Sequence, residues 1–253
     1  MGLNGSVRPV RLLYRCSMRS RDSNEGASPL GRIFLANVGV NASHRLVSPL
    51  FADGSFALVS IPDPSSLVTY GDVPHLKAVV PERCWSRGTH YDPEFDTRTY
   101  GDNCGWAPRA AALKACRPGD LLFFIARLIG SGGPVFALVG VLEVEEVLPE
   151  ACEPIPQRFA ANAHVRRARV DGEYGFWVFA GSARSRLFER AAIVGRAEAE
   201  LLFRDKSGQP WTWRDGRSEL QTIGSYTRSC RCVIDPAVEP ARAQAFWAWL
   251  GDR

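Results

Sequence analysis

The chain has 253 residues, of which 45% are hydrophobic and 23% are charged, a composition typical of a globular protein with a full core. Its longest apolar run, residues 121–126, is far shorter than the roughly 20 apolar residues that span a bilayer. No apolar stretch follows the N-terminal arginines, as one does in a secretory signal. These features argue against a membrane protein, and we expect the chain to be cytoplasmic.

The net charge of +4 is unevenly distributed. Residues 1–31 hold five arginines and two acidic residues, so the remainder is nearly neutral. A neutral body argues against wide, non-specific duplex binding, which depends on many phosphate contacts. Residues 143–153 carry five glutamates, whereas residues 158–196 carry eight arginines against three acidic residues. The second segment therefore predicts one basic face.

The seven cysteines are odd in number and irregularly spaced, which predicts free thiols in a chain without a secretion signal. Cys230 and Cys232 are separated by one residue, fewer than the two to four of common zinc motifs. A metal site built from Cys84, Cys104, Cys230 and Cys232 is the less favoured alternative. We therefore expect no metal ion and no cofactor.

Residues 1–31 are rich in arginine, serine and glycine, and we expect a disordered basic tail. Met18 is an alternative start, so the sequence leaves open whether residues 1–17 belong to the native protein. We expect residues 32–253 to form a single α+β domain. Its first strand is predicted at 33–40, followed by an Asp-Gly hairpin turn at 53–54 and a return strand.

Loop-rich sequence over residues 62–105 separates this hairpin from the second half, and long loops of this kind are often functional. The second half predicts a long hairpin, one further strand and several short helices. Residues 160–170 fit either a helix or a strand. The other ranges are a return strand at 56–61, helices at 107–116, 197–203 and 236–250, a loop that leads into a short helix at 182–190, and strands at 121–128, 135–147 and 174–180. Hairpins without βαβ alternation predict an α+β protein with a strongly bent mixed β-sheet or barrel and short flanking helices.

Standard catalytic motifs are absent from the sequence, but polar residues gather in four places. The first is the end of the first strand, where Asn37, Asn41 and His44 lie in a position that commonly binds ligands. The alternative is that the asparagines cap turns and His44 is a surface residue.

The second place is the loop-rich segment, where Tyr91 and Tyr100 stand beside polar residues and could stack on a base. The alternative is that both tyrosines fasten the loop to the body. Histidines and carboxylates in these first two places could supply a general base. The catalytic candidates are His44, His90 and Asp92.

The third place holds Asn162, His164 and Arg166, which face one way in an extended strand and suit a base edge or a phosphate. An ordinary exposed strand is the alternative. In the fourth, a serine that caps a helix between two arginines would favour an anion, and the alternative is a plain cap with solvated arginines. These residues are Arg184, Ser185 and Arg186.

Several blocks of the chain resemble the nucleotide modification associated domain 3 family, which was proposed from its association with DNA base-modification systems. The most specific blocks are ANVGVNASHRLVSPLFADGSFALVSIPD and PGDLLFF, and weaker ones are FALVGVLEVEEV and VFAGSARSRLFERAAIV. The resemblance covers roughly residues 32–195. We place the family domain at approximately 32–235, with a C-terminal helix at 236–250.

A looser resemblance links GDLLFF and VGVLEV to PUA-like barrels, including the EVE and ASCH groups. Those domains bind RNA or modified bases, usually in an aromatic-lined pocket. This resemblance implies a PUA-like barrel as one form of the bent sheet. The strand and hairpin of residues 32–61 have no counterpart in those barrels.

The resemblance to the nucleotide modification family implies that the chain binds nucleic acid or a nucleotide, alongside proteins of a DNA-modification system. The leading hypothesis is a module that takes a modified or flipped base into a pocket. The alternatives are a transferase or hydrolase acting on a nucleotide or modified base, or an interaction scaffold. Whether the chain is an enzyme, which base or polymer it binds, and its oligomeric state stay open. In the leading hypothesis Tyr91, Tyr100, Trp106 or Trp177 stacks on the base, Asn162 and His164 contact its edge, and Arg166, Arg184 and Arg186 hold phosphate.

Overall fold

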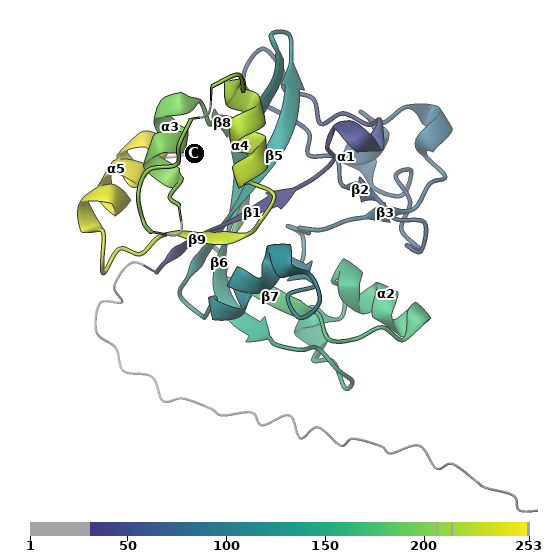
Figure 1. Ribbon diagram of the computed structural model, residues 1–253. Helices are drawn as coiled ribbons and strands as arrows, with labels where there is room; N and C mark the ends of the chain where they lie inside the picture. Colours follow the sequence, from purple (N-terminus) through teal and green to yellow (C-terminus); the bar gives the residue numbers. More distant parts are fainter. Residues whose placement is uncertain (1–30, 206, 214, 252–253) are drawn as a thin grey trace, which may run out of the picture.

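The computed structural model describes residues 31–205, 207–213 and 215–251 (Figure 1). The expected basic tail lies outside this range, apart from Gly31. Within the described ranges, no helix combines the length and the apolar character needed to cross a membrane.

Nine strands and several short helices make up the described part of the chain. The strands are β1 (Ile33–Val38), β2 (Ile61–Pro62), β3 (Thr89–His90), β4 (Thr99–Asp102), β5 (Leu121–Gly130), β6 (Gly133–Leu148), β7 (Trp177–Gly181), β8 (Arg186–Ile193) and β9 (Arg231–Ile234). The α-helices are α1 (Pro74–Lys77), α2 (Ala163–Asp171), α3 (Arg196–Leu202), α4 (Glu219–Tyr226) and α5 (Pro240–Leu250). Single 3₁₀ segments are η1 (Ala42–His44), η2 (Glu82–Cys84), η3 (Pro108–Ala115) and η4 (Gln157–Phe159).

Seven of the strands form one mixed sheet in the order β4-β7-β6-β5-β1-β9, with β8 paired to β6. The central pair β1 and β5 is parallel, whereas the other neighbours are antiparallel. The short strands β2 and β3 form a separate two-stranded sheet. The large sheet ends at β4 and β9, and β8 is a further edge strand beside β6, so the sheet is not closed.

Both faces of the central strands are buried, so their residues alternate between two hydrophobic cores. On one face Phe123 and Ile125 of β5 pack with side chains from α3, α4 and α5, which lie together on one side of the sheet in Figure 1. On the other face Leu122 and Phe124 pack against η3, β4 and β7. Apolar runs such as IFLANV in β1 reflect this double burial.

The parallel pair brings the carboxyl ends of β1 and β5 to the same edge of the sheet. Val38 of β1 pairs with Ala126 of β5, so the polar residues that follow Val38 lie near Arg127. Gly39 turns the chain at this point with a positive φ of 76°. A Cβ atom there would lie 2.7 Å from Leu58, so this turn requires glycine.

The mixed α+β architecture agrees with the sequence prediction, but the PUA-like barrel does not form, because the sheet is open. The strands predicted at 33–40, 121–128, 135–147 and 174–180 correspond to β1, β5, β6 and β7, and the helices at 197–203 and 236–250 to α3 and α5. The helix predicted at 107–116 is the 3₁₀ segment η3, and residues 160–170 are mostly helical, in α2.

Two local predictions were wrong. Residues 186–193 form the strand β8 and not a helix, because Leu187 and Ala192 pair with the long strand β6. Long-range pairing here overrides the local helical preference. The return strand predicted at 56–61 is reduced to a bridge between Leu50 and Phe56 and to β2. Short segments missing from the prediction, notably α4 and β9, depend on packing against the sheet.

The carboxylate of Asp120 connects the start of β1 to the start of β5. It accepts hydrogen bonds from the backbone N and the guanidinium Nη2 of Arg32, at 3.0 and 2.6 Å, and from the backbone N of Arg117 at 2.8 Å. Asp120 is only 6% exposed. Because a buried carboxylate needs such donors, this interaction stabilises the parallel pair.

Replacing this carboxylate by an amide, Asp120→Asn, is expected to lower the free energy of unfolding by about 2–3 kcal/mol. One acceptor oxygen becomes a donor that faces other donors, and Arg32 loses its counter-charge. Urea denaturation measures the change. The matched control Asp96→Asn alters an exposed carboxylate and should change stability by less than about 0.5 kcal/mol. Similar stabilities for the two variants would contradict the role given to Asp120.

Candidate functional site

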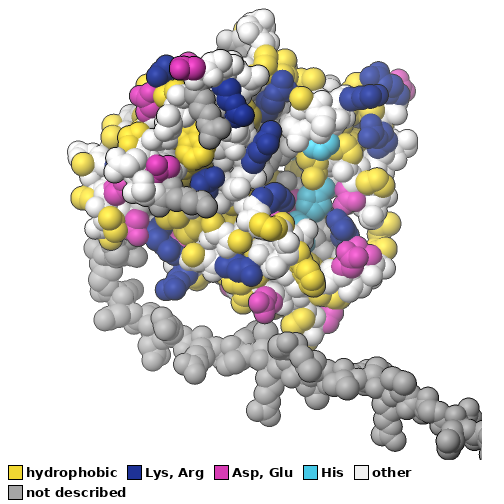
Figure 2. Space-filling view, viewed as in Figure 1, with side chains coloured by type: hydrophobic (Ala, Val, Ile, Leu, Met, Phe, Trp, Pro, Cys, Tyr) yellow, Lys and Arg dark blue, Asp and Glu magenta, His cyan; other side chains and the backbone are white. Residues whose placement is uncertain are grey.

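A cavity of about 1340 Å³ opens where the end of β1, the small β2–β3 sheet, β4, α2 and α4 meet. Figure 2 shows histidine side chains within a hollow on this face, with Lys and Arg side chains around them. The polar and charged lining residues are Asn37, Asn41, Ser43, His44, Asp63, His90, Asp92, Tyr100, Asp102, Asn103, Arg109, Arg127, His164, Arg167, Arg217, Gln221, Ser225, Thr227 and Arg228.

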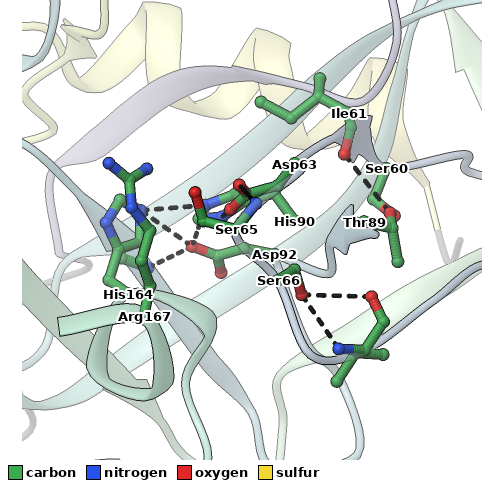
Figure 3. Close-up of polar contacts among 12 residues, drawn as sticks. Ser60, Ile61, Asp63, Ser65, Ser66, Thr89, His90, Asp92, His164 and Arg167 are labelled. Atoms are coloured by element: carbon green, nitrogen blue, oxygen red, sulfur yellow. Dashed lines mark hydrogen bonds and ion pairs between the residues drawn. The ribbon is translucent and has the colours of Figure 1, made fainter. Parts of the chain in front are cut away.

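Three of these side chains converge closely: His90 from β3, Asp92 two residues later and His164 from the first turn of α2 (Figure 3). The Nε2 atoms of the two histidines are 3.1 Å apart. Asp92 Oδ2 lies 3.7 Å from His90 Nε2 and 3.6 Å from His164 Nε2. We call these three residues the His–Asp centre. Asp92 and His164 are both only 8% exposed.

Neighbouring groups hold the His–Asp centre in place. Asp63 Oδ2 lies 3.5 Å from His90 Nδ1, and Asp92 Oδ2 accepts a 2.8 Å hydrogen bond from the backbone N of Gly101. Asn162 is fully buried; its Nδ2 lies 3.4 Å from Asp92 Oδ1, and its Oδ1 accepts a hydrogen bond from His164 N. Asn162 is thus both the N-cap of α2 and a support for the carboxylate.

Burial controls the ionisation of the His–Asp centre. Desolvation raises the pKa of Asp92 well above its ordinary value and lowers the pKa of His164 well below its ordinary value, because burial disfavours the charged form of each group. The hydrogen bond with His90 lowers the pKa of Asp63. His164 therefore presents a neutral imidazole near neutral pH, with one ring nitrogen available as an acceptor.

The charges around the cavity favour an anion. Asp102 is paired with Arg109 at 2.9 Å and also accepts a hydrogen bond from Tyr100. Arg127 is half-buried on β5, and its side chain makes no ion pair or hydrogen bond with any described residue. Arg217 and Arg228 likewise have no ion pair within the described ranges, and both are exposed at the cavity. These three are called the unpaired arginines below.

The end of β1 is connected to α4 across the cavity. Asn37 Nδ2 donates a 3.0 Å hydrogen bond to Oγ1 of Thr227, the residue that ends α4. Arg228 follows directly and lines the cavity. Asn41 and His44 form a reciprocal cap of η1, in which His44 Nδ1 accepts a 3.0 Å hydrogen bond from Asn41 N. Both the functional and the capping interpretation of these residues are therefore compatible with the structure.

The structure brings about half of the predicted site residues together. Seven line the cavity, and Asn162 lies directly behind it, in contact with Asp92. The seven are Asn37, Asn41, His44, His90, Asp92, Tyr100 and His164.

The remaining candidates lie outside the cavity. Tyr91 packs near His75 in a satellite core, and the side chain of Trp106 is 75% exposed. Trp177 packs against one of the two main cores, and Arg166 lies 3.7 Å from Glu94. Because α2 is helical, Asn162, His164 and Arg166 do not share one face as they would in a strand.

The arginine-rich fourth cluster does not form an anion site at a helix N-terminus. Residues 186–193 are the strand β8, so no helix begins after Ser185. The Ser185 hydroxyl accepts a hydrogen bond from Glu143 N, and Arg184 forms an ion pair with the Glu143 carboxylate. Arg186 is exposed at the start of β8.

Several cavity residues were missed by the sequence analysis. Arg127 carried the clearest signal, because it interrupts an otherwise apolar strand. An arginine at such a position needs a partner or a solvent-filled space. Asp63 lies between two prolines and carried no signal of its own. The other charged lining residues without a sequence prediction are Arg109, Arg167, Arg217 and Arg228.

Residues 32–226 match the family described as nucleotide modification associated domain 3. The chain belongs to this family. The family resemblance seen in the sequence is thus confirmed, and the matched region extends beyond the recognisable blocks to include α4. Of the cavity-lining residues, only Thr227 and Arg228 lie outside the matched range. No curated protein and no solved structure matches the chain.

Gly101 of the nucleotide modification associated domain provides a test of how tightly the His–Asp centre is packed. A Cβ atom there would lie 2.5 Å from His164 Cδ2 and 2.8 Å from Asn162 Oδ1. Gly101→Ala should therefore displace His164, lower the free energy of unfolding by about 1–3 kcal/mol, and shift the imidazole NMR signals of His90 and His164.

Gly132→Ala in the β5–β6 turn is the matched control, because a Cβ atom there meets no heavy atom within 4 Å. It should leave both imidazole signals unchanged. Unperturbed His164 signals in Gly101→Ala would show that the centre is more loosely packed than the distances indicate.

Proposed function

We propose that the protein is an enzyme that acts on a nucleotide bound in the cavity. The phosphate contacts the unpaired arginines, and the reacting part of the nucleotide lies against the His–Asp centre. The observation that carries this proposal is the convergence of that centre and three unpaired arginines in one cavity, in a chain of a nucleotide modification associated family.

The arginines support a phosphorylated ligand. Guanidinium groups bind phosphate through charge-assisted, frequently bidentate hydrogen bonds. The acidic groups that line the same cavity are already engaged: Asp102 with Arg109, Asp63 with His90, and Asp92 with Gly101 and Asn162. A phosphate therefore gains partners at Arg127, Arg217 and Arg228 without competing with a neighbouring carboxylate.

The size of the cavity supports more than an isolated nucleoside. Its volume of about 1340 Å³ exceeds the roughly 300–1,000 Å³ of ordinary small-molecule sites. The space suffices for a nucleotide together with a second reactant, or for a nucleotide with its flanking residues in a single strand. The ligand class is accordingly a nucleotide, either free or part of a nucleic acid.

The arrangement favours an enzyme over a module that only binds a base. Of the four aromatic candidates for stacking, only Tyr100 lines the cavity; it is 4% exposed, and its hydroxyl donates to Asp102. A stacking platform is therefore weakly supported. In contrast, imidazole and carboxylate groups with strongly shifted pKa values in a cavity are typical of catalytic sites.

Nucleotide binding is tested with Arg127→Gln. Calorimetric titration with deoxynucleoside monophosphates should show binding to the wild type, and an affinity roughly 10–100-fold lower for the variant, because a charged hydrogen bond contributes about 1.5–3 kcal/mol. The unphosphorylated nucleosides should bind both proteins equally. A single-stranded oligodeoxynucleotide, titrated in a salt series, distinguishes a polymer from a free nucleotide.

The matched control for this titration is Arg83→Gln, an exposed arginine outside the cavity, which should bind like the wild type. Equal nucleotide affinities for the wild type and both variants would contradict phosphate binding by Arg127.

Catalysis is tested separately from binding. The protein is incubated with nucleotides or DNA, and the nucleosides are then analysed by mass spectrometry for a change of mass. Wild-type protein should produce a new species, and His90→Gln should produce none while retaining nucleotide affinity. Binding without any conversion, across unmodified and modified bases, would instead favour the binding module.

A further inference from the structure

We infer that His90, Asp92 and His164 bind one divalent transition-metal ion. Within the described ranges, they are the only group of three or more potential ligand residues whose ligand atoms all lie within 4.8 Å of one another. The four cysteines Cys84, Cys104, Cys230 and Cys232 do not form such a group. The metal site therefore involves residues that sequence spacing did not associate with a metal.

The dimensions of the His–Asp centre fit an ion. With separations of 3.1, 3.6 and 3.7 Å, the point equidistant from the three atoms in their plane lies about 2.0 Å from each. An ion displaced slightly from that plane reaches about 2.0–2.2 Å, the length of bonds from zinc to imidazole nitrogen and carboxylate oxygen. The side chains thus need little movement to coordinate an ion.

The orientation of the ligands is also appropriate. Asp63 approaches Nδ1 of His90, which favours the tautomer whose Nε2 lone pair faces the centre. Gly101 and Asn162 support the Asp92 carboxylate from behind. Hydrogen bonds that orient metal ligands from outside are a regular feature of metal sites, and their loss typically weakens metal affinity 10–100-fold. Asp63 is therefore a positioning residue for His90.

The ligand set indicates the class of ion. Two imidazole nitrogens and one carboxylate oxygen suit Zn²⁺, Fe²⁺ or Co²⁺, whereas Mg²⁺ and Ca²⁺ prefer oxygen ligands. Three protein ligands leave coordination positions open, as in catalytic and not in structural sites. All three ligand residues line the cavity, so the open positions face the space assigned to the nucleotide. A bound ion there polarises an oxygen of the substrate or lowers the pKa of a bound water.

That catalytic role rests on the proposed function, but metal binding does not. Nucleotide affinity is tested at Arg127 and metal affinity at His90, so the two proposals can fail independently. A protein that binds Co²⁺ but no nucleotide keeps the metal site and removes the proposed substrate. A protein that binds a nucleotide but no Co²⁺ supports the nucleotide site and contradicts the metal site.

The test uses the full-length protein after treatment with a chelator. Titration with Co²⁺, followed by visible absorption, should show one bound ion per chain, and Zn²⁺ should displace it. His90→Ala should lower the affinity at least 100-fold, while circular dichroism confirms that the variant is folded. His75→Ala, which removes an exposed histidine outside the cavity, is the matched control and should bind Co²⁺ like the wild type.

Asp63→Asn separates positioning from coordination. This variant should weaken Co²⁺ binding about 10–100-fold. It should still bind one ion per chain with the same absorption spectrum, because the three ligands His90, Asp92 and His164 remain. If His164→Ala or Asp92→Asn fails to fold, His90→Ala and Asp63→Asn still decide the result. Absence of stoichiometric binding by the wild type, or equal binding by wild type and His90→Ala, overturns the inference. The His–Asp centre is then a hydrogen-bonded pair of histidines beside a buried carboxylate.

Discussion

A buried carboxylate must be surrounded by donors or by a cation, and Asp92 is the carboxylate around which this site is organised. Its two oxygens contact the backbone of Gly101 in β4, the amide of Asn162 before α2, and the imidazoles of His90 and His164. The loop-rich segment that carries His90, Asp92 and Gly101 therefore meets the N-cap of α2, 70 positions along the chain from Asp92, at one side chain. Moving either segment would leave a buried polar group without its partner. The position of each segment therefore depends on the position of the other.

The central sheet supplies the other half of the cavity. Since β1 and β5 are parallel, both end at the same edge, and the polar residues after Val38 lie beside Arg127. The carboxyl ends of parallel strands are frequent ligand sites for this geometrical reason. Here α4 completes the wall, and the Asn37–Thr227 hydrogen bond fastens the end of that helix to the end of β1.

The local charge of the cavity differs from the net charge of the chain. The whole chain is only mildly basic, at +4, and much of its arginine forms ion pairs elsewhere, as Arg184 does with Glu143 and Arg32 with Asp120. In the cavity, by contrast, Arg127, Arg217 and Arg228 line one concave space and have no acidic partner in the part of the chain that the structure describes. An anion bound there interacts with charges that the fold has left uncompensated.

The sequence by itself determined the family, the α+β class and the main strands, because buried strands such as β1 and β5 carry continuous apolar runs. It also indicated His90, Asp92 and His164 one at a time as polar residues of interest. Only the tertiary structure decided that these three meet and that Trp106 and the Arg184–Arg186 segment lie apart from them. The physical reason is that Asp92 and Asn162, the N-cap of α2, lie 70 positions apart in the chain. Their contact depends on how β4 and β7 pair and how Asn162 starts that helix, which no local pattern records.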